Sequence, residues 1–193
     1  MDAYLREGGE TFSEVFVCGV GVLESSLRLT RYLEKHHSHI SAVLHFGVAG
    51  AYIQETDSTP DLLDICIAEH EILGDLGICY PRRFDDLGGE LELKRTFALD
   101  KNLVRKALQL LKQSENNVFK GNFVTVNSVS GTLERGDILR RKYNGLCENM
   151  EGAAVARVCM DFSLSLLEMR CISNYVEDRD PTRWRLPEAC ERA

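Results

Sequence analysis

Apolar positions in this 193-residue chain fall into two patterns: short continuous runs, and longer segments in which they recur every three or four residues. The runs predict buried strands, because a strand covered on both faces has few polar positions. The wider spacing predicts helices with one apolar face. By these patterns we expect strands at 15–19, 42–46, 62–73, 77–80, 122–126 and 164–172, and helices at 23–37, 100–111, 134–143, 151–162 and 187–193.

Strands and helices alternate along the chain, and this order is typical of α/β folds. We therefore expect a three-layer α/β/α sandwich with a mixed, mostly parallel central sheet, formed by residues 1–193 as a single domain. In such sheets ligands bind beyond the carboxyl ends of the strands. The glycine-rich segment 47–50 and the pair Ser173–Asn174 are both expected at that edge.

Composition and charge restrict the partners. The net charge is −7 and no basic stripe is present, so we expect no nucleic-acid partner. No run of about 18 apolar residues exists and the N-terminus is unlike a signal peptide, which argues against a membrane and for the cytoplasm. The seven cysteines include no C-x-x-C pair and fit a reduced compartment. No His, Cys or acid cluster has ligand spacing, so we expect no metal and no cofactor.

Two polar pairs border apolar elements. Met150–Glu151 stands at the start of the apolar helix 151–162, and Ser173–Asn174 follows the strand 164–172. Each has an ordinary explanation. A carboxylate in the first turn of a helix gains about 0.3–1 kcal/mol from the helix dipole. An Asn that follows a strand is a common turn residue.

Taken together, these segments resemble one known superfamily. The sequences Asn149-Met150-Glu151-Gly152-Ala153-Ala154 and Arg170-Cys171-Ile172-Ser173-Asn174 are similar to those of the purine nucleoside phosphorylases and nucleosidases, and the similarity runs from about Val15 to Ala189. Segments 74–77 and 178–184 are most similar to the futalosine hydrolases. The resemblance implies a nucleoside phosphorylase-like fold, a small-molecule nucleoside substrate and a homo-oligomer.

The resemblance also assigns roles to residues of this chain. It implies that Glu151 accepts hydrogen bonds from the ribose hydroxyls and that Asn174 recognises the base, so these two are the catalytic candidates. A carboxylate beside the sugar favours the transition state, because cleavage of an N-ribosidic bond develops positive charge on the ribose. The implied substrate-binding residues are Met150 on the sugar face, Ser173 beside Asn174, Gly50 at a close backbone approach, and Val129 and Ser130 against the purine.

Asn174 indicates the kind of base. Relatives that act on 6-aminopurines have Asp at this position, whereas those that prefer 6-oxopurines tend to have Asn. An amide side chain carries both a donor and an acceptor. It can donate to O6 of hypoxanthine and accept from a protonated N7, but it cannot act as a general acid. We therefore expect a hypoxanthine-type ribosyl substrate.

The segment Leu44–Ala51 resembles the glycine-rich turn of the superfamily but lacks its anion-binding residues. The phosphorylases have Arg and Ser where this chain has His45 and Val48. Val cannot hydrogen-bond an anion, and a neutral His would replace a permanent cation. The sequence therefore predicts hydrolysis by water rather than phosphorolysis.

The ends of the chain depart from the superfamily. Its nucleosidases use a Glu that follows the first buried strand to activate water, and Glu7, Glu10 and Glu14 do not follow such a strand. The chain also stops within what should be a closing helix. We therefore expect a sheet without its usual first strand and a chain truncated at both ends. Whether it is a fragment, or whether another group supplies the base, stays open.

The predicted function is that of a futalosine hydrolase, which releases hypoxanthine from futalosine and leaves dehypoxanthine futalosine, in the futalosine route to menaquinone. One alternative is a methylthioadenosine or adenosylhomocysteine nucleosidase, or a purine nucleoside phosphorylase. The other is a non-catalytic nucleoside-binding or structural remnant.

Overall fold

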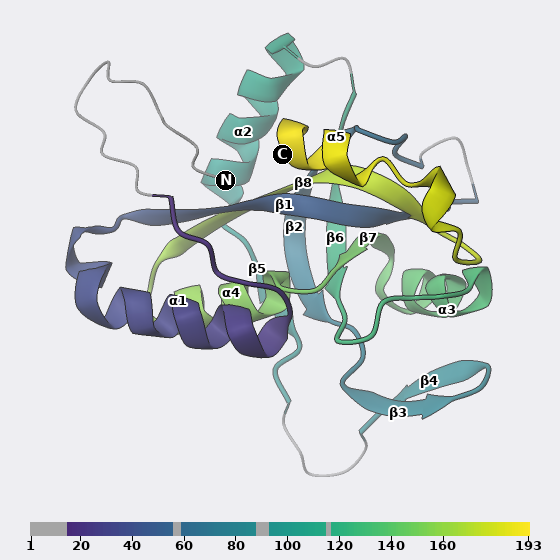
Figure 1. Cartoon of the computed structure of the whole chain (residues 1–193). Coiled ribbons are helices and arrows are strands. Elements are labelled where there is room, and N and C mark those ends of the chain that lie inside the picture. Colours follow the sequence, from purple (N-terminus) through teal and green to yellow (C-terminus); the bar gives the residue numbers. More distant parts are fainter. Residues whose placement is uncertain (1–14, 56–58, 88–92, 115–116) are drawn as a thin grey trace.

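The computed structural model of the chain describes residues 15–55, 59–87, 93–114 and 117–193, and it is built around one mixed sheet (Figure 1). The strands run in the order β5-β2-β6-β7-β1-β8, and β2 also pairs with β8, so five of the six strands close into a ring. The long pairings β1–β8 and β2–β6 are parallel, whereas β7 and β5 pair antiparallel with β1 and β2. The strands are β1 (Ala42–Tyr52), β2 (Ile65–Leu73), β5 (Thr96–Ala98), β6 (Val118–Thr125), β7 (Gly145–Asn149) and β8 (Ser165–Val176).

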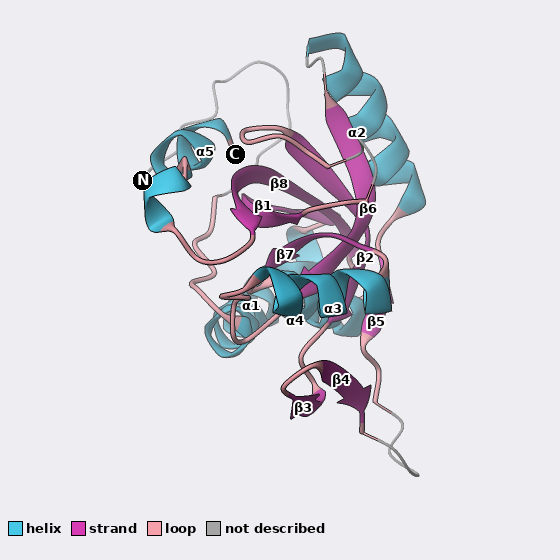
Figure 2. Cartoon of the chain, turned by 90° about the vertical axis from the view of Figure 1, so that its right-hand side faces the viewer, coloured by secondary structure: helices cyan, strands magenta, loops and turns pink. Residues whose placement is uncertain are grey.

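Helices cover the sheet on two sides, as Figures 1 and 2 show together. On one side lie α1 (Val22–His36), α3 (Leu133–Tyr143) and α4 (Gly152–Asp161), and on the other lie α2 (Lys101–Ser114) and α5 (Leu186–Arg192). A hairpin of β3 (Gly77–Tyr80) and β4 (Arg83–Asp86) projects beyond α3, and two short 3₁₀ helices are η1 (His37–His39) and η2 (Pro181–Arg183). The predicted α/β class with a mixed central sheet is confirmed.

The N-terminus of helix α4 contacts polar residues at the ends of two strands. Its side chains are small, mostly Ala and Val, and seven of its ten residues are buried. Small side chains let a helix approach its neighbours closely, and α4 packs against both α1 and the strands. The N-terminus of α4 therefore lies within the fold, beside the ends of β6 and β7.

The strand prediction at the start of the chain was wrong. Residues 15–19 form no strand, and Val15, Phe16 and Val17 are exposed. They have no edge to join at β1, because β7 and β8 already occupy its two sides. The sequence pattern also missed the short strands β4, β5 and β7. Of these, β7 has only two apolar residues and ends in Glu148–Asn149. It is held in place by pairing with β1 and β6.

Candidate functional site

An irregularity in β8 brings Ser173 and Asn174 to one pocket. The pair was predicted to follow the strand, but both residues lie within it, near its carboxyl end. The pairing of β1 with β8 steps from Ala49↔Ile172 to Gly50↔Asn174, which leaves Ser173 as an extra residue. In a regular strand, neighbouring side chains point to opposite faces. The bulge changes this alternation, so Ser173 and Asn174 can line the same cavity.

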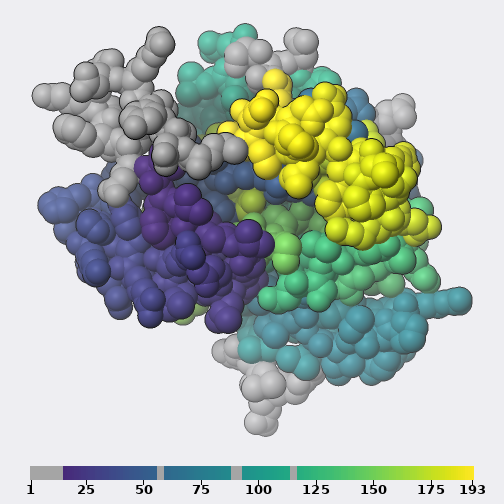
Figure 3. Space-filling view, in the orientation of Figure 1, coloured from purple at the N-terminus to yellow at the C-terminus, as the bar shows by residue number. Residues whose placement is uncertain are grey.

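That cavity has a volume of about 180 Å³ and gathers five of the seven predicted site residues. Figure 3 shows the face where the N-terminal helix, the α3 region and the C-terminal segment converge. The walls come from the ends of β1, β7 and β8, from the loop before α3, and from residues 175–186. The predicted residues that line it are Val129, Ser130, Met150, Ser173 and Asn174.

Gly50 lies directly behind Asn174. A Cβ atom at position 50 would lie 3.0 Å from Nδ2 of Asn174 and 3.0 Å from a methyl group of Val176. The missing side chain therefore leaves room for the Asn174 amide. Oδ1 of that amide accepts a hydrogen bond from the Ser173 hydroxyl at 2.8 Å, and Nδ2 donates to the Tyr175 carbonyl at 3.1 Å. One N–H and one lone pair of the amide are still available to a ligand.

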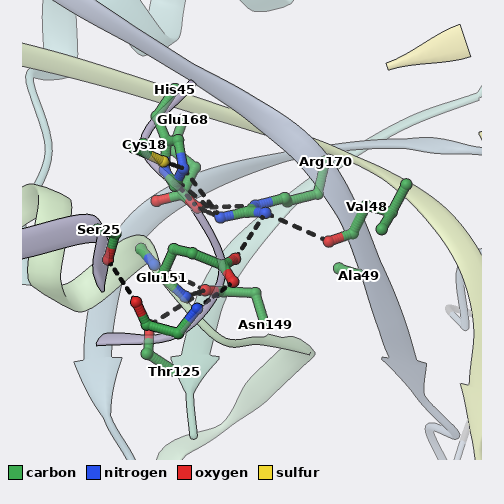
Figure 4. Close-up of polar contacts among 12 residues, drawn as sticks. Cys18, Ser25, His45, Val48, Ala49, Thr125, Asn149, Glu151, Glu168 and Arg170 are labelled. Atoms are coloured by element: carbon green, nitrogen blue, oxygen red, sulfur yellow. Dashed lines mark hydrogen bonds and ion pairs between the residues drawn. The ribbon is translucent and has the colours of Figure 1, made fainter. Parts of the chain in front are cut away.

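Glu151 occupies the N-cap position of α4, but its carboxylate does not cap the helix. Instead, Oε1 accepts from the backbone N–H of Gly21 at 3.0 Å, and Oε2 accepts from Nη1 of Arg170 at 3.2 Å (Figure 4). The helix is capped by Asn149, whose Oδ1 accepts from the N–H groups of Glu151 and Gly152 at 2.9 and 2.7 Å. Stabilisation of a helix N-terminus therefore does not account for this carboxylate. Glu151 does not line the pocket itself, but Nη1 of Arg170 contacts both its carboxylate and the carbonyl of Val48, which does.

Arg170 is buried and organises the polar groups around Glu151. Besides Glu151, its Nη1 donates to the carbonyl of Val48 at 3.3 Å, and Nε and Nη2 both lie 2.9 Å from Oε1 of Glu168. His45 lies against the same two partners, with Nδ1 3.2 Å from Oε1 of Glu168 and Nε2 3.3 Å from Nη2 of Arg170. His45 is thus part of a buried network rather than a pocket wall (Figure 4).

The geometry of this pocket can be compared with known proteins. The model of the Phosphorylase superfamily matches residues 9–193. The chain belongs to this superfamily. Futalosine hydrolase of Thermus thermophilus is 33% identical over 175 residues, covering 89% of this chain and 73% of the relative. Futalosine hydrolase of Acidothermus cellulolyticus is 30% identical over 181 residues, covering 93% and 71%.

Solved structures agree with this membership. A futalosine hydrolase mutant of Helicobacter pylori superposes with a TM-score of 0.76 over 91% of this chain and 74% of the neighbour, at 20% identity, which shows that the fold is shared. By sequence alone, a 5′-methylthioadenosine/S-adenosylhomocysteine nucleosidase of Staphylococcus epidermidis is 25% identical over 158 residues, covering 81% of this chain and 65% of the relative. The predicted resemblance to the futalosine hydrolases within the phosphorylase superfamily is confirmed.

Sequence reasoning missed several residues of this superfamily member's site. Arg170 is the first residue of the segment 170–174 that resembles the superfamily, but the sequence analysis gave it no role. Glu168 and Arg170 lie two positions apart in an apolar strand, so their side chains share one face. Because charged residues are rarely buried unless paired, their position in the sequence already required partners. The sequence alone did not show that His45 and Glu151 would be among these partners.

Glu148 is a further missed residue, and it lines the pocket directly. Its carboxylate accepts from both the N–H and the hydroxyl of Ser130 at 2.8 Å, and from the Tyr52 hydroxyl at 3.2 Å. Burial raises the pKa of Glu148 above its ordinary value, although the hydrogen bonds from Ser130 oppose the shift. Glu148 therefore fixes the position of Ser130.

Asp75 holds the loop that carries Val129 and Ser130. Its carboxylate accepts from the N–H groups of Asn127 and Ser128 at 2.6 and 3.1 Å, and from the Asn127 amide at 3.1 Å. Asp75 lies in the predicted 74–77 segment, so that segment supports the pocket from outside it.

The segment after β8 forms the outer wall of the pocket. The Arg179 guanidinium lies 4.4 Å from the centre of the Trp184 ring, and Glu177 forms a 2.7 Å ion pair with Arg183. The N–H of Arg179 donates to the Gly131 carbonyl, which fastens this segment to the loop before α3. Arg179 and Trp184 both line the cavity.

Other expectations concern metals, cysteines, membranes and the general base. All seven cysteines are free thiols. In the described ranges, no three His, Cys, Asp or Glu side chains are arranged to hold a metal, and no helix is long and apolar enough to cross a membrane. Glu7, Glu10 and Glu14 lie outside the described residues.

Proposed function

We propose that this protein hydrolyses the N-ribosidic bond of futalosine and releases hypoxanthine, leaving dehypoxanthine futalosine, as a step in menaquinone biosynthesis. One observation carries the proposal: Met150, Ser173 and Asn174, from two distant segments, line one pocket. Glu151 follows Met150 in the chain, and Arg170 links its carboxylate to the carbonyl of Val48, a lining residue. The two futalosine hydrolases at 33% and 30% identity support the same activity.

The ribose would lie against Met150 and Glu151. The carboxylate of Glu151 has one oxygen on Arg170 and one on Gly21, and each carboxylate oxygen has a second lone pair for a sugar hydroxyl. As the bond to the base breaks, the sugar gains oxocarbenium character. A carboxylate held in place stabilises that charge more than it stabilises the ground state. The electron pair of the broken bond leaves with the base, which takes up a proton at N7 from solvent. Water adds at the anomeric carbon and releases a proton to solvent, so the products are the ribose hydroxyl and neutral hypoxanthine.

The base would lie against Asn174. In the structure the Asn174 amide has one N–H and one lone pair available, a pattern that complements O6 and a protonated N7 of hypoxanthine. The Tyr175 carbonyl can only accept, so its contact with Nδ2 fixes which side of the amide donates, and the Ser173 hydroxyl then donates to Oδ1. The leaving hypoxanthine would be stabilised by these hydrogen bonds.

The surroundings favour water over phosphate. His45 is enclosed by Glu168 and Arg170, and Val48 offers the pocket no donor from its side chain. Of the described lining residues, Arg179 is the one with a cationic side chain, and it stacks on Trp184. A phosphate in the pocket would instead meet a set of acidic side chains, namely Glu148, Glu177 and Asp180.

The proposal extends to a cytoplasmic homo-oligomer. Seven free thiols are compatible with a reducing compartment. Several apolar side chains near the N-terminal end of α1 are strongly exposed, including Val17, Val20 and Leu23. A second copy could cover such a patch, and light scattering after size-exclusion chromatography would measure the number of copies.

The direct experiment supplies futalosine, inosine and methylthioadenosine to the purified chain, with and without phosphate, and follows the free base by chromatography. Hypoxanthine released from futalosine, at a rate independent of phosphate, is the expected result. Release only with phosphate would make the protein a phosphorylase, and preference for methylthioadenosine would make it a nucleosidase of the other group. Binding of hypoxanthine without any turnover would select a non-catalytic role.

A substitution tests the ribose contact. Glu151→Gln should lower kcat by about 10²–10³-fold with a modest change in KM, because the amide keeps the shape of the side chain but loses the charge that stabilises the transition state. Glu69→Gln is the control, since Glu69 lies on β2 and pairs with Lys120 away from the pocket. Full activity of Glu151→Gln would show that the ribose assignment is wrong.

A further inference from the structure

Two buried carboxyl groups meet beneath the N-terminus of α4. Glu71 of β2 and Glu168 of β8 are both fully buried, and both crowd the space beside Gly152. A Cβ at position 152 would lie 1.9 Å from Oε1 of Glu71 and 2.6 Å from Oε2 of Glu168. We propose that Glu71 and Glu168 share one proton, carried by Glu71, and that this carboxyl pair is a positioning unit that holds both the backbone and the carboxylate of Glu151.

The Glu71 side of the pair holds the backbone. Its two oxygens accept from Nδ2 of Asn149 and from the hydroxyl of Thr125, each at 2.7 Å. Asn149 in turn accepts from the N–H groups of Glu151 and Gly152, and Thr125 accepts from the N–H of Ala153 at 2.7 Å. Glu71 thus orients the two side chains that cap the first turn of α4.

The Glu168 side of the pair holds the carboxylate. Oε1 of Glu168 is 2.9 Å from Nε and 2.9 Å from Nη2 of Arg170, which fixes the plane of the guanidinium. The opposite edge of that guanidinium donates to Oε2 of Glu151 at 3.2 Å (Figure 4). Both carboxyl groups therefore act on Glu151: Glu71 positions its backbone through Asn149, and Glu168 positions its carboxylate through Arg170.

The other oxygen of Glu168 indicates where the proton lies. Oε2 is buried and receives no hydrogen bond from an amide, hydroxyl or cationic group of the described residues. It faces the carboxyl of Glu71, which can donate only if it is protonated. A single proton on Glu71 satisfies Oε2 and avoids two adjacent buried negative charges.

The remaining charged groups around the pair favour the same distribution. Burial, and then the charge of Glu168, raise the pKa of Glu71 well above its ordinary value. Burial acts in the same direction on Glu168, but His45 and Arg170 outweigh it and lower the pKa of that carboxyl. The other titratable groups that interact with the pair are the thiols of Cys18, before α1, of Cys147 on β7 and of Cys159 on α4. The Glu151 carboxylate, at the N-cap of α4, interacts with Arg170.

This role rests on the proposed function, because it matters for catalysis only if Glu151 contacts the ribose. Misplacement of a group by about 1 Å can reduce an enzymatic rate about 10²-fold. The pair is neither in the pocket wall nor in contact with a substrate there, so its effect on the reaction would be transmitted through Glu151.

The test compares two matched variants, Glu71→Gln and Glu168→Gln. Loss of the Glu71 proton at alkaline pH would place two negative charges side by side, so kcat of the parent protein should decline there. Gln is a neutral replacement for a protonated Glu, so Glu71→Gln should keep most of the activity and show no such decline. Glu168→Gln removes the negative charge that fixes Arg170, and should lower kcat about 10²-fold with little change in KM. Glu69→Gln, on the same strand but away from the pair, should behave as the parent protein does.

A second measurement does not need turnover. Infrared spectra of the full chain with ¹³C-labelled Glu should show a protonated carboxyl band at neutral pH, and the band should be absent in Glu71→Gln and present in Glu148→Gln. If futalosine is not hydrolysed but the band is present, the proposed function fails and the shared proton stands. Absence of the band in the parent protein, or an equal loss of kcat in the two Gln variants, would overturn the proposal.

Discussion

The close approach of Gly152 to the buried carboxyl pair gives the sharpest test of the structure. In Gly152→Ala, the new methyl group would lie 1.9 Å from Oε1 of Glu71, where ordinary contacts begin at 3.4 Å. The carboxyl must therefore retreat by about 1.5 Å, which is the difference between these two distances, and its 2.7 Å hydrogen bond to Asn149 cannot survive such a shift.

The expected cost follows from these contacts. Overpacking a core costs about 1–3 kcal/mol, and a buried polar group left without its partner adds about 1–3 kcal/mol. The better helix propensity of Ala returns about 1 kcal/mol. We expect the free energy of unfolding to fall by about 3 kcal/mol, out of a total of about 5–15 kcal/mol for a typical protein.

The assay is urea unfolding followed by circular dichroism at constant pH. Gly131→Ala is the matched control, because no atom lies within 4 Å of the added Cβ and the change should be neutral or slightly stabilising. In a double-mutant cycle with Glu71→Ala, the two losses should overlap by about 0.5–3 kcal/mol, since both disrupt the same contacts. A cost below about 1 kcal/mol for Gly152→Ala would refute the described arrangement.

Three further predictions concern specificity, substrate affinity and pH. Asn174→Asp should lower kcat/KM for hypoxanthine nucleosides relative to adenine nucleosides by roughly tenfold or more, because a carboxylate cannot donate a hydrogen bond to O6. An unchanged ratio of the two kcat/KM values in competition assays would contradict the base contact. Asp75→Ala should raise KM by roughly fivefold with little change in kcat, because hydrogen bonds worth about 1 kcal/mol to the position of the loop 127–130 are lost. Steady-state kinetics would measure both constants, and an effect confined to kcat would contradict this role of Asp75. The folded protein raises the pKa of Glu71 above 4.5, so the free energy of unfolding should fall as pH rises from about 4.5 through the raised pKa. This fall should be smaller in Glu71→Gln, which has no proton to lose at this position. Equal slopes for the two proteins in urea titrations across this pH range would contradict the assignment.

Local sequence determined the helices and most of the strands, because the spacing of apolar residues depends only on the geometry of each element. The ranges predicted for α1, α3 and α4 lie within one or two residues of those observed. The motifs around Met150 and Asn174 likewise identified the superfamily and five residues of one pocket.

Tertiary structure decided how these elements meet. The strand β7 has too few apolar residues to be recognised alone, and it exists because β1 and β6 supply its hydrogen-bond partners. Residues 15–19 have a strand-like pattern but no strand because they find no such partner at β1. Strand pairing joins residues far apart in the sequence, so a local pattern cannot record it.

The contacts of the site also join residues that are far apart in the sequence, so the sequence and the structure give different information about it. The sequence determined which polar residues the chain has, including two charged residues within an apolar strand that required buried partners. The fold alone determined that Arg170 would hold Glu151, that Glu71 would face Glu168, and that a bulge would bring Ser173 and Asn174 to one cavity. Each of these contacts joins different strands and helices, and its energy depends on burial that only the packed structure provides.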